Sequence, residues 1–257
     1  MKANFHTHTY RCHHATGEDR EYFEAAASRG LEVIGFSDHS PYYFPEGYYS
    51  NFRMRPDEVD GYVGSLTTLA EEFNGYFKTY IGYEMEYYPD LFDRALAEVI
   101  KQNRCDYLIL GQHFPKVEMG NPSSGSPHDR AEDLKDYVDS VCAAMKTGCF
   151  FYVAHPDLFN FTGDLDIYRE QMRRLCTVAK ETDTPLEINL LGLRQGRDYP
   201  REEFWKIAAE VGNKSILGCD AHRPCDLADP DGILQGLKYA EKFGVEVIEP
   251  LEPKLLK

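Results

Sequence analysis

The chain has 257 residues, 42% of them hydrophobic, and its 43 acidic and 28 basic side chains give a formal net charge of −15 at pH 7. This length allows one (β/α) barrel or two smaller domains, and the negative charge disfavours a nucleic-acid partner because a polyanion would be repelled. No apolar run approaches the roughly 18 residues that span a bilayer, and seven cysteines without a CxxC pair fit reduced thiols, so we expect a cytoplasmic protein without a membrane partner.

Short apolar stretches alternate with helical periodicity from one end of the chain to the other. The predicted strands are residues 3–5, 32–36, 79–83, 107–110, 150–154, 186–188, 215–217 and 245–248. The predicted helices begin near Glu18, Pro56, Asp90, Arg130, Asp166, Pro200 and Asp229. The glycines expected to end helices are Gly30, Gly148, Gly212 and Gly244. This alternation predicts an α/β fold with a parallel sheet, in a single domain over residues 1–257.

The segment FHTHTYRCHH, residues 5–14, holds four of the nine histidines and begins as a strand. Side chains two apart on a strand point to the same side, so His6 and His8 can reach one cation together. His13 or His14 can return from the following loop to a second cation. The alternative is a surface histidine-rich segment or a tag remnant, but a tag would have consecutive histidines.

Histidines and carboxylates also follow five other predicted strands. They are Asp38 and His39 in FSDHS, Glu84 and Glu86 in GYEMEYY, His113 in LGQHF, His155 in VAHPD, and Asp220 and His222 in GCDAH. One histidine after a strand is more often a packed or capping residue, but the repetition argues against that reading here. Because the carboxyl ends of parallel barrel strands meet at one face, we expect these side chains to share a site. Weaker ligand candidates are Asp38, Cys12 and Cys219, the last of which should face away.

Metal ions are the expected reason for this gathering, because so many buried imidazoles and carboxylates are costly without cations. About nine ligands exceed the three or four that one tetrahedral zinc takes, so we predict two or three divalent ions. Imidazole and carboxylate ligands fit Zn, Fe and Mn alike. A carboxylate such as Glu84 can bridge two ions, and metal pairs about 3.5–4 Å apart recur in phosphoester hydrolysis, where they activate a shared water.

Three long connections surround the predicted site. Residues 41–55 are dense in aromatic side chains, which suggests a wall or lid, with packing on a neighbouring helix as the alternative. Residues 114–128 are rich in Gly, Ser and Pro, and residues 189–199 bring two arginines after a strand. We expect aromatic side chains between Tyr42 and Tyr49 to pack on a substrate ring, and Glu86 to receive a substrate ammonium group.

The order of these motifs resembles the PHP (polymerase and histidinol phosphatase) family. The matching residues are His6 and His8, then His14, His39, Glu84 in GxE, His113 in GxH, His155 in AHPD, and Asp220 and His222 in DAH. The resemblance implies a distorted (β/α)7 barrel with a trinuclear metal centre. The implied ion sites are His6, His8, Glu84 and Asp220; Glu84, His113 and His155; and His14, His39 and His222. The resemblance therefore favours His14 over His13 and Glu84 over Glu86.

Within that family, several segments are similar to the histidinol-phosphate phosphatases. They are FRMRPDEVDGY, GYEMEYYPD, DYLILGQHF and EINLLGLR followed by YP. The similarity implies hydrolysis of a small phosphate monoester, L-histidinol phosphate, by a metal-bridging hydroxide. It places Glu84, Asp220 and His222 in the catalytic centre and Arg194 on the substrate phosphate; the alternative for Arg194 is a pair with Asp198 or solvent.

Two departures leave the substrate open, namely the glutamine of GQHF and the lack of a basic residue after AHPD. One alternative function is a phosphodiesterase or exonuclease of the same family, which the acidic balance disfavours. The other is a metal-binding protein without catalysis, which an intact ligand set beside an arginine disfavours.

Overall fold

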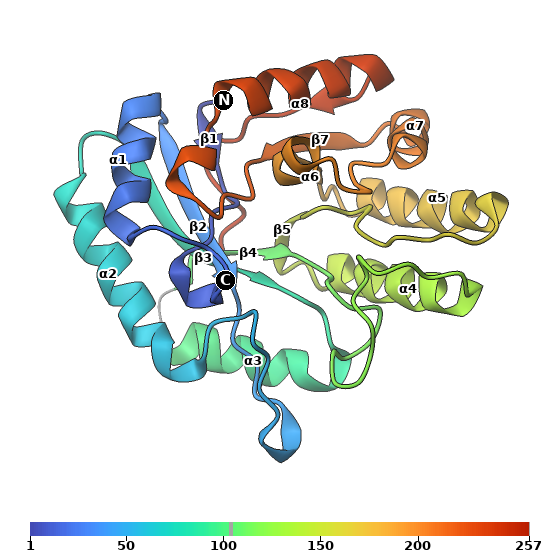
Figure 1. Cartoon of the computed structure of the whole chain (residues 1–257), viewed down its shortest axis with the longest axis horizontal. Coiled ribbons are helices and arrows are strands. Elements are labelled where there is room, and N and C mark those ends of the chain that lie inside the picture. Colours follow the sequence, from blue (N-terminus) through green and yellow to red (C-terminus); the bar gives the residue numbers. More distant parts are fainter. Residues whose placement is uncertain (103–104, 257) are drawn as a thin grey trace.

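Eight parallel strands form one sheet, in chain order, in the computed structural model, which describes residues 1–102 and 105–256 (Figure 1). The strands are β1 (Ala3–Asn4), β2 (Val33–His39), β3 (Lys78–Met85), β4 (Tyr107–Leu110), β5 (Phe150–Val153), β6 (Leu186–Asn189), β7 (Lys214–Gly218) and β8 (Glu246–Val247). Each strand pairs in parallel with its neighbours in the chain. The predicted parallel sheet is confirmed.

The sheet curls until the chain beyond β7 reaches the chain beyond β1. Thr7 and Ala221 form an isolated parallel bridge, and the backbone N–H of His8 donates to the carbonyl oxygen of Ala221 at 3.0 Å. The short strand β8 pairs instead with the start of β7, where Lys214 lies opposite Glu246. Seven strands therefore surround the carboxyl end of the sheet, which is the distorted (β/α)7 barrel that the family resemblance implied.

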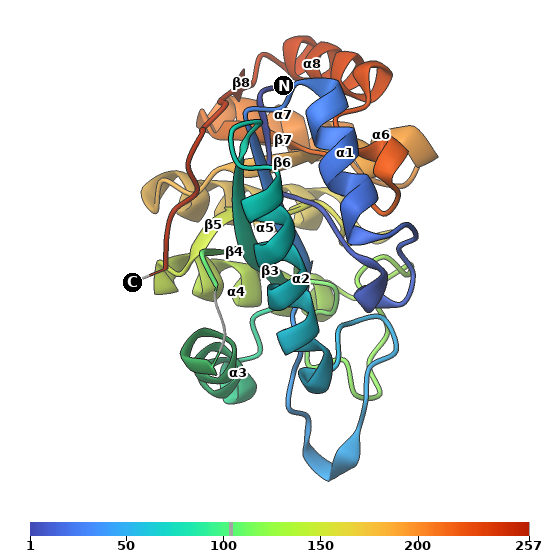
Figure 2. The ribbon, with the colours of Figure 1, turned by 90° about the vertical axis from the view of Figure 1, so that its left-hand side faces the viewer.

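The helices cover the outer face of the curled sheet, as the two perpendicular views show (Figures 1 and 2). They are α1 (Asp19–Arg29), α2 (Val59–Glu72), α3 (Pro89–Gln102), α4 (Ala131–Thr147), α5 (Leu165–Glu181), α6 (Leu190–Gln195), α7 (Glu202–Val211) and α8 (Pro230–Phe243), with 3-10 turns η1 (Tyr10–Cys12), η2 (Pro45–Gly47), η3 (Pro56–Glu58) and η4 (Pro224–Asp226). The predicted helix starts agree within three residues, whereas the six-residue α6 was not predicted. Across the described residues, no helix is both long and apolar enough to cross a bilayer.

Glycine ends five of these helices. Four were predicted from the sequence, namely Gly30, Gly148, Gly212 and Gly244, with φ of 68°, 72°, 78° and 70°. The fifth is Gly196 after α6, with φ of 60°. This left-handed conformation costs a residue without a side chain little, and it lets the amide bond back to the last helical carbonyls. Each helix can then stop and return the chain to the next strand.

An apolar cluster fills the barrel beneath the carboxyl ends of the strands. Its members are Ala3, Phe5, Val33, Tyr80, Tyr107, Ile109, Phe151, Tyr152, Ala154 and Ile216. The hydroxyl of Tyr107 crosses the interior and donates to the carbonyl oxygen of Phe5 at 2.8 Å. Tyr80 shares a strand face with Glu84 through the two-residue period of β3. The cluster is therefore an apolar floor for the polar side chains above it.

Candidate metal centre

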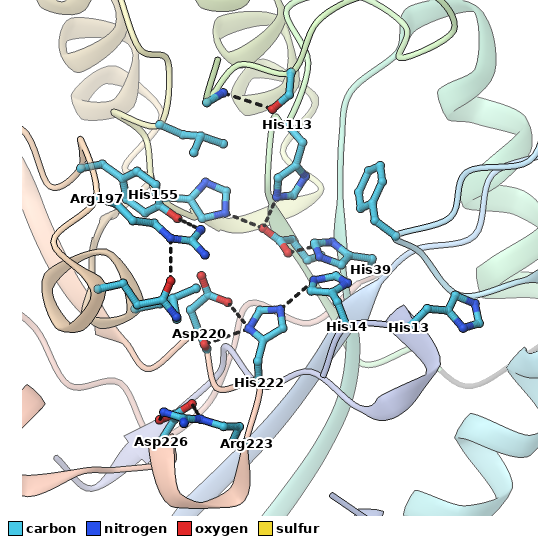
Figure 3. A pocket seen from close by; sticks show the side chains of 18 of the residues that line it. His13, His14, His39, His113, His155, Arg197, Asp220, His222, Arg223 and Asp226 are labelled. Carbon is cyan, nitrogen blue, oxygen red and sulfur yellow. Dashed lines mark hydrogen bonds and ion pairs between the residues drawn. The ribbon is translucent and has the colours of Figure 1, made fainter. Parts of the chain in front are cut away.

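A cavity of about 990 Å³ opens at the carboxyl ends of the strands (Figure 3). Seven of the nine predicted ligands line it: His14, His39, Glu84, His113, His155, Asp220 and His222. His6 and His8 are fully buried next to them, each with Nε2 at 3.5 Å from Oε2 of Glu84. The fold thus brings together residues that lie more than 200 positions apart in the sequence.

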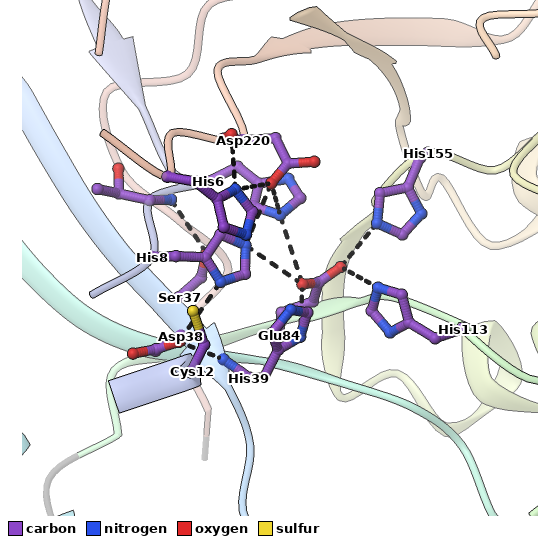
Figure 4. Close-up of polar contacts among 12 residues, drawn as sticks. His6, His8, Cys12, Ser37, Asp38, His39, Glu84, His113, His155 and Asp220 are labelled. Carbon is purple, nitrogen blue, oxygen red and sulfur yellow. Dashed lines mark hydrogen bonds and ion pairs between the residues drawn. The ribbon is translucent and has the colours of Figure 1, made fainter. Parts of the chain in front are cut away.

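Four side chains at the base of the cavity have the spacing of a tetrahedral metal site (Figure 4). His6 Nε2 lies 3.5 Å from Asp220 Oδ1, and His8 Nε2 lies 3.2 Å from the same oxygen. Together with the 3.5 Å separations from Glu84 Oε2, these values match the edge of about 3.4 Å expected for ligands about 2.1 Å from a zinc ion. Donor atoms set this far apart fit a cation between them.

The same atoms also lack hydrogen bonds, which supports that fit. His6 Nε2, His8 Nε2 and Glu84 Oε2 are buried and have no hydrogen-bond partner within the described chain. Buried polar atoms are normally paired, because an unpaired one costs about 1–3 kcal/mol. A divalent ion would satisfy all of them at once.

The second oxygen of Glu84 faces a different pair of histidines. His155 Nε2 lies 2.8 Å and His113 Nε2 lies 3.4 Å from Glu84 Oε1. Glu84 therefore presents one oxygen to each of two groups of imidazoles, as a carboxylate bridging two ions would. Strand periodicity had left open whether Glu84 or Glu86 faces the histidines, and this arrangement identifies Glu84.

A third group of histidines stands nearer the mouth of the cavity. The ring nitrogens of His14, His39 and His222 lie within 4.8 Å of one another. His14 Nε2 and His222 Nε2 are 3.0 Å apart, and His39 Nδ1 lies 3.1 Å from Glu84 Oε2. His13, by contrast, places its Nε2 2.9 Å from the hydroxyl of Tyr49.

Hydrogen bonds behind the ligands fix their rings, and the sequence reasoning missed the residue at the centre of this network. Glu187 on β6 is fully buried, and its Oε1 lies 2.7 Å from His6 Nδ1. Its Oε2 accepts from the backbone N–H of His155 at 2.9 Å and from Nδ2 of Asn189 at 2.8 Å. Asn189 also donates to Asp220 at 3.1 Å. Such outer partners orient metal-binding histidines and fix which nitrogen carries the proton.

Asp38 supports His8 in a similar way. Its Oδ1 lies 3.4 Å from His8 Nδ1 and accepts from the backbone N–H of His39 at 2.9 Å, while its Oδ2 accepts from the hydroxyl of Thr9. Both carboxylate oxygens of Asp38 are therefore already engaged by protein groups next to the ligand residues. Cys219, as predicted, faces away: its sulfur accepts from the backbone N–H of Ala228 at 3.2 Å.

Charge interactions among these groups perturb their protonation in the metal-free protein. Burial opposes a charged ring, yet Glu187 and other carboxylates raise the pKa of His6 to about 10. His113 is only partly exposed, which also opposes a charged ring, but Glu84 raises its pKa to about 9. Partial desolvation within the cavity and the neighbouring imidazoles of His222 and His8 lower the pKa of His14 to about 4. Burial disfavours ionisation of Glu84, but the surrounding histidines, His113 first, hold its pKa well below the usual value. The cluster thus attracts positive charge.

Local backbone geometry is adapted to this crowding. His155 and Asp220 have φ of 29° and 46°, which is unusual for residues other than glycine and is typical of functional sites. At Gly111 a Cβ atom would overlap the carboxylate of Glu84, and at Gly218 it would overlap that of Glu187. Two glycines therefore leave room for the buried carboxylates.

Arginine side chains line the wall of the cavity, but the arginine for which a phosphate contact was predicted is not among them. Among the described residues, the lining includes Arg197 and Arg223 but not Arg194. Arg194 donates to the carbonyl oxygen of Cys219 at 2.8 Å, while Asp198 accepts from Asn160 at 2.9 Å. The contact between Arg194 and a substrate phosphate stays a prediction.

Two further expectations about substrate contacts do not agree with the structure. Glu86 is fully buried and paired with Arg53 through two hydrogen bonds of 2.9 and 3.0 Å, so it is not free for a substrate ammonium group. Within the loop 41–55, Asn51 and Phe52 line the cavity, rather than the aromatic side chains between positions 42 and 49. Phe52 packs edge-on against His39, with ring centres 5.3 Å apart, so this part of the loop is a wall of the site.

Comparison with known proteins finds relatives that match most of the chain. A probable histidinol-phosphatase of Deinococcus radiodurans is 31% identical over 226 residues, which cover 85% of each chain. The histidinol-phosphatase of Bacillus subtilis is 26% identical over 258 residues, covering 88% of this chain and 96% of the relative.

Among solved structures, the histidinol phosphate phosphatase of Lactococcus lactis, determined with zinc, L-histidinol and phosphate, has a TM-score of 0.73 at 19% identity over 98% of both chains. A putative histidinol phosphatase of Listeria monocytogenes has a TM-score of 0.68 at 20% identity, covering 90% of this chain and 99% of that one. These two share the fold. The PHP domain matches residues 4–190, which is more than half of the sequence, and the chain belongs to the PHP domain family.

Proposed function

We propose that this chain is a metal-dependent phosphatase that hydrolyses a small phosphate monoester, with L-histidinol phosphate as its substrate. The observation that carries the proposal is the convergence of nine imidazole and carboxylate side chains on one cavity, with buried donor atoms that lack other partners. The relatives named histidinol-phosphatase, at 31% and 26% identity, support the choice of substrate.

Three sets of residues would hold the ions. They are His6, His8, Glu84 and Asp220; Glu84, His113 and His155; and His14, His39 and His222. Bound divalent ions, of Zn, Fe or Mn, would polarise the phosphoryl oxygens and lower the pKa of a bound water. Zinc in the related structure from Lactococcus lactis supports Zn as the first ion to test.

The side chains around this centre would bind the substrate phosphate and hold the ions. Arg197 and Arg223 line the cavity and would attract the phosphate, since a guanidinium suits its oxygens. Asp220 and His222 stand at the same wall, and as proposed ligands they would hold the ions that activate the attacking water. The cavity of about 990 Å³ is large enough for a small-molecule ester.

Two measurements test the proposal. Elemental analysis of the purified protein should find bound divalent metal, and phosphate release should be faster from L-histidinol phosphate than from sugar phosphates or a single-stranded oligonucleotide. His155→Asn should lose metal and turnover, whereas His128→Asn, which changes a histidine that contacts the Ser123 carbonyl instead, should keep both. A fully metal-loaded protein without turnover on any ester would contradict a catalytic role.

The role of Arg194 needs a separate test. If Arg194 contacts the phosphate, Arg194→Ala should raise KM by more than about tenfold with little change in kcat, because uniform binding energy would be lost. An unchanged KM would remove the proposed contact.

A further inference from the structure

A buried arginine connects the metal centre to the two long loops around it. Arg53 lies near the end of the aromatic loop 41–55, and the residue is only 1% exposed. Its guanidinium donates to both oxygens of Glu86, at 2.9 and 3.0 Å, to Glu118 in the loop 114–128, and to the carbonyl oxygen of Ser40 at 3.0 Å. The end of β2, the end of β3 and a second loop thus meet at one side chain.

The carboxylate that Arg53 binds also holds a candidate metal ligand. Glu86 Oε1 lies 2.8 Å from His113 Nδ1. On the other side of the ring, His113 Nε2 lies 3.4 Å from Glu84, a contact that Figure 4 shows. A ring that donates its Nδ1–H to Glu86 keeps the lone pair of Nε2 for an ion. Arg53 locks Glu86 in the position that this hydrogen bond requires.

The chemistry of the contacts explains why an arginine occupies position 53. Two buried carboxylates, Glu86 and Glu118, face one guanidinium, which has enough donors for both and for the Ser40 carbonyl as well. The ring of Phe52 lies 4.5 Å from the guanidinium carbon, and the same ring packs 5.8 Å from that of His113. Lysine, with a single nitrogen, could not bind Glu86 through two parallel hydrogen bonds.

We propose that Arg53 is a positioning residue of the metal centre, which fixes the ring of His113 through Glu86 and ties that ring to the loop 114–128 through Glu118. The inference rests on the proposed metal site and goes beyond it, because Arg53 touches none of the nine proposed ligands. A purely structural arginine would hold the loops together without affecting how tightly the ion at His113 is retained.

Retention of Zn²⁺ separates these two roles. Zinc-loaded Arg53→Met, which keeps the chain length but loses the donors, should release one class of Zn²⁺ to a competing chelator about 10–100-fold more readily than the unmodified protein. The Zn²⁺ that His113→Asn releases identifies that class of ion. Combining His113→Asn with Arg53→Met should add little further loss, because both changes act on the same ion. Arg20→Met is the matched control, since it removes a bidentate pair with Glu72 away from the cavity.

A second pair of variants keeps the test valid if Arg53→Met folds poorly. The double change Arg53→Met with Glu118→Gln removes one positive and one negative charge, so the net charge stays that of the unmodified chain. It should fold and still lose Zn²⁺ like Arg53→Met. Glu118→Gln alone should retain Zn²⁺ but expose the loop 114–128 to faster proteolysis.

The proposal is overturned if Arg53→Met or the double variant folds and holds every Zn²⁺ as tightly as the unmodified protein. It is also overturned if Glu118→Gln leaves proteolysis of the loop unchanged. Zinc retention is measured without substrate, so failure of the proposed phosphatase activity would be seen separately, as full zinc content without phosphate release.

Discussion

Replacing Glu187 with glutamine should weaken the metal centre, the fold or both, because its buried carboxylate faces donors on both oxygens. Oε1 lies 2.7 Å from His6 Nδ1, and Oε2 accepts from the backbone N–H of His155 and from Asn189. Glutamine has nearly the same shape, but one end accepts hydrogen bonds and the other, an NH₂ group, only donates. Either orientation of the amide therefore sets a donor against a donor.

The two orientations damage different properties. With its NH₂ group toward His6, the amide forces Nδ1 of the ring to accept and moves the ring proton to Nε2, the atom that faces Glu84 and Asp220. That proton would occupy the lone pair that an ion needs. With its NH₂ group toward His155, the amide leaves two buried donors without an acceptor.

The loss that each orientation causes has an expected size. Loss of the outer partner of a metal-binding histidine typically lowers metal affinity about 10–100-fold. Two buried donors without acceptors cost about 1–3 kcal/mol each, so the free energy of unfolding should fall by about 2–6 kcal/mol. The amide will adopt the less costly orientation, and at least one of the two losses must appear.

The assay combines chelator competition for Zn²⁺ with urea unfolding of the metal-free protein. Glu210→Gln is the control, since Glu210 forms an exposed pair with Arg173 and its loss should change stability by less than about 1 kcal/mol. If Glu187→Gln binds Zn²⁺ and unfolds in urea like the unmodified protein, Glu187 does not orient His6 and the reasoning fails.

Three other perturbations test the site from different sides. Gly111→Ala should displace the Glu84 carboxylate and lower the zinc content, whereas Gly61→Ala, where a Cβ meets nothing within 4 Å, should leave it unchanged; equal zinc contents would contradict the packing argument. Arg197→Ala should raise KM for the ester about tenfold or more, measured by phosphate release, and an unaltered KM would show that Arg197 does not contact the phosphate. Carboxylates raise the pKa of His6 to about 10 despite its burial, so the metal-free ring is an imidazolium near neutral pH. An ion that binds the ring must therefore displace one of its two protons. Calorimetric titration with Zn²⁺ in two buffers should therefore show proton release that diminishes as the pH rises toward about 10, and release that does not vary with pH would refute the displacement.

Much of the fold and the ligand set follows from sequence patterns that act over short distances. Glycine caps such as Gly30 and Gly148 mark where helices end, because their left-handed φ depends on local backbone geometry. His6, Glu84 and Asp220 could be placed together because parallel strands carry their carboxyl ends to one face of a barrel. Position along a strand was enough to predict that these residues meet.

Residues that act across strands were harder to predict. Glu187 orients His6 from five strands away around the sheet, and no spacing in the sequence joins them. One signal was present, since a carboxylate within the apolar strand LEIN is costly unless it is paired. Arg53 lies in a loop without periodicity, so its contact with Glu86 could not be read from a pattern.

The arginines after β6 show a different limit. The segment 189–199 was expected to be a loop, but Leu190–Gln195 forms the short helix α6, with Asn189 as its N-cap. The turn of this helix directs Arg194 to the carbonyl oxygen of Cys219 and leaves Arg197, beyond the helix, beside the cavity. A helix of six residues carries too little periodicity to be recognised, so the direction of each arginine was not predictable.

The net charge and the proposed substrate are reconciled by the ions themselves. Five carboxylates beside the base of the cavity are at most 4% exposed: Asp38, Glu84, Glu86, Glu187 and Asp220. In the metal-free protein such a cluster draws protons onto neighbouring imidazoles, which is why the pKa of His6 is raised despite burial. Each bound divalent ion would replace these protons with two positive charges, so the cavity would attract a phosphate dianion while the chain keeps its formal charge of −15. Binding of the anionic substrate should therefore depend on metal loading, whatever the charge of the outer surface.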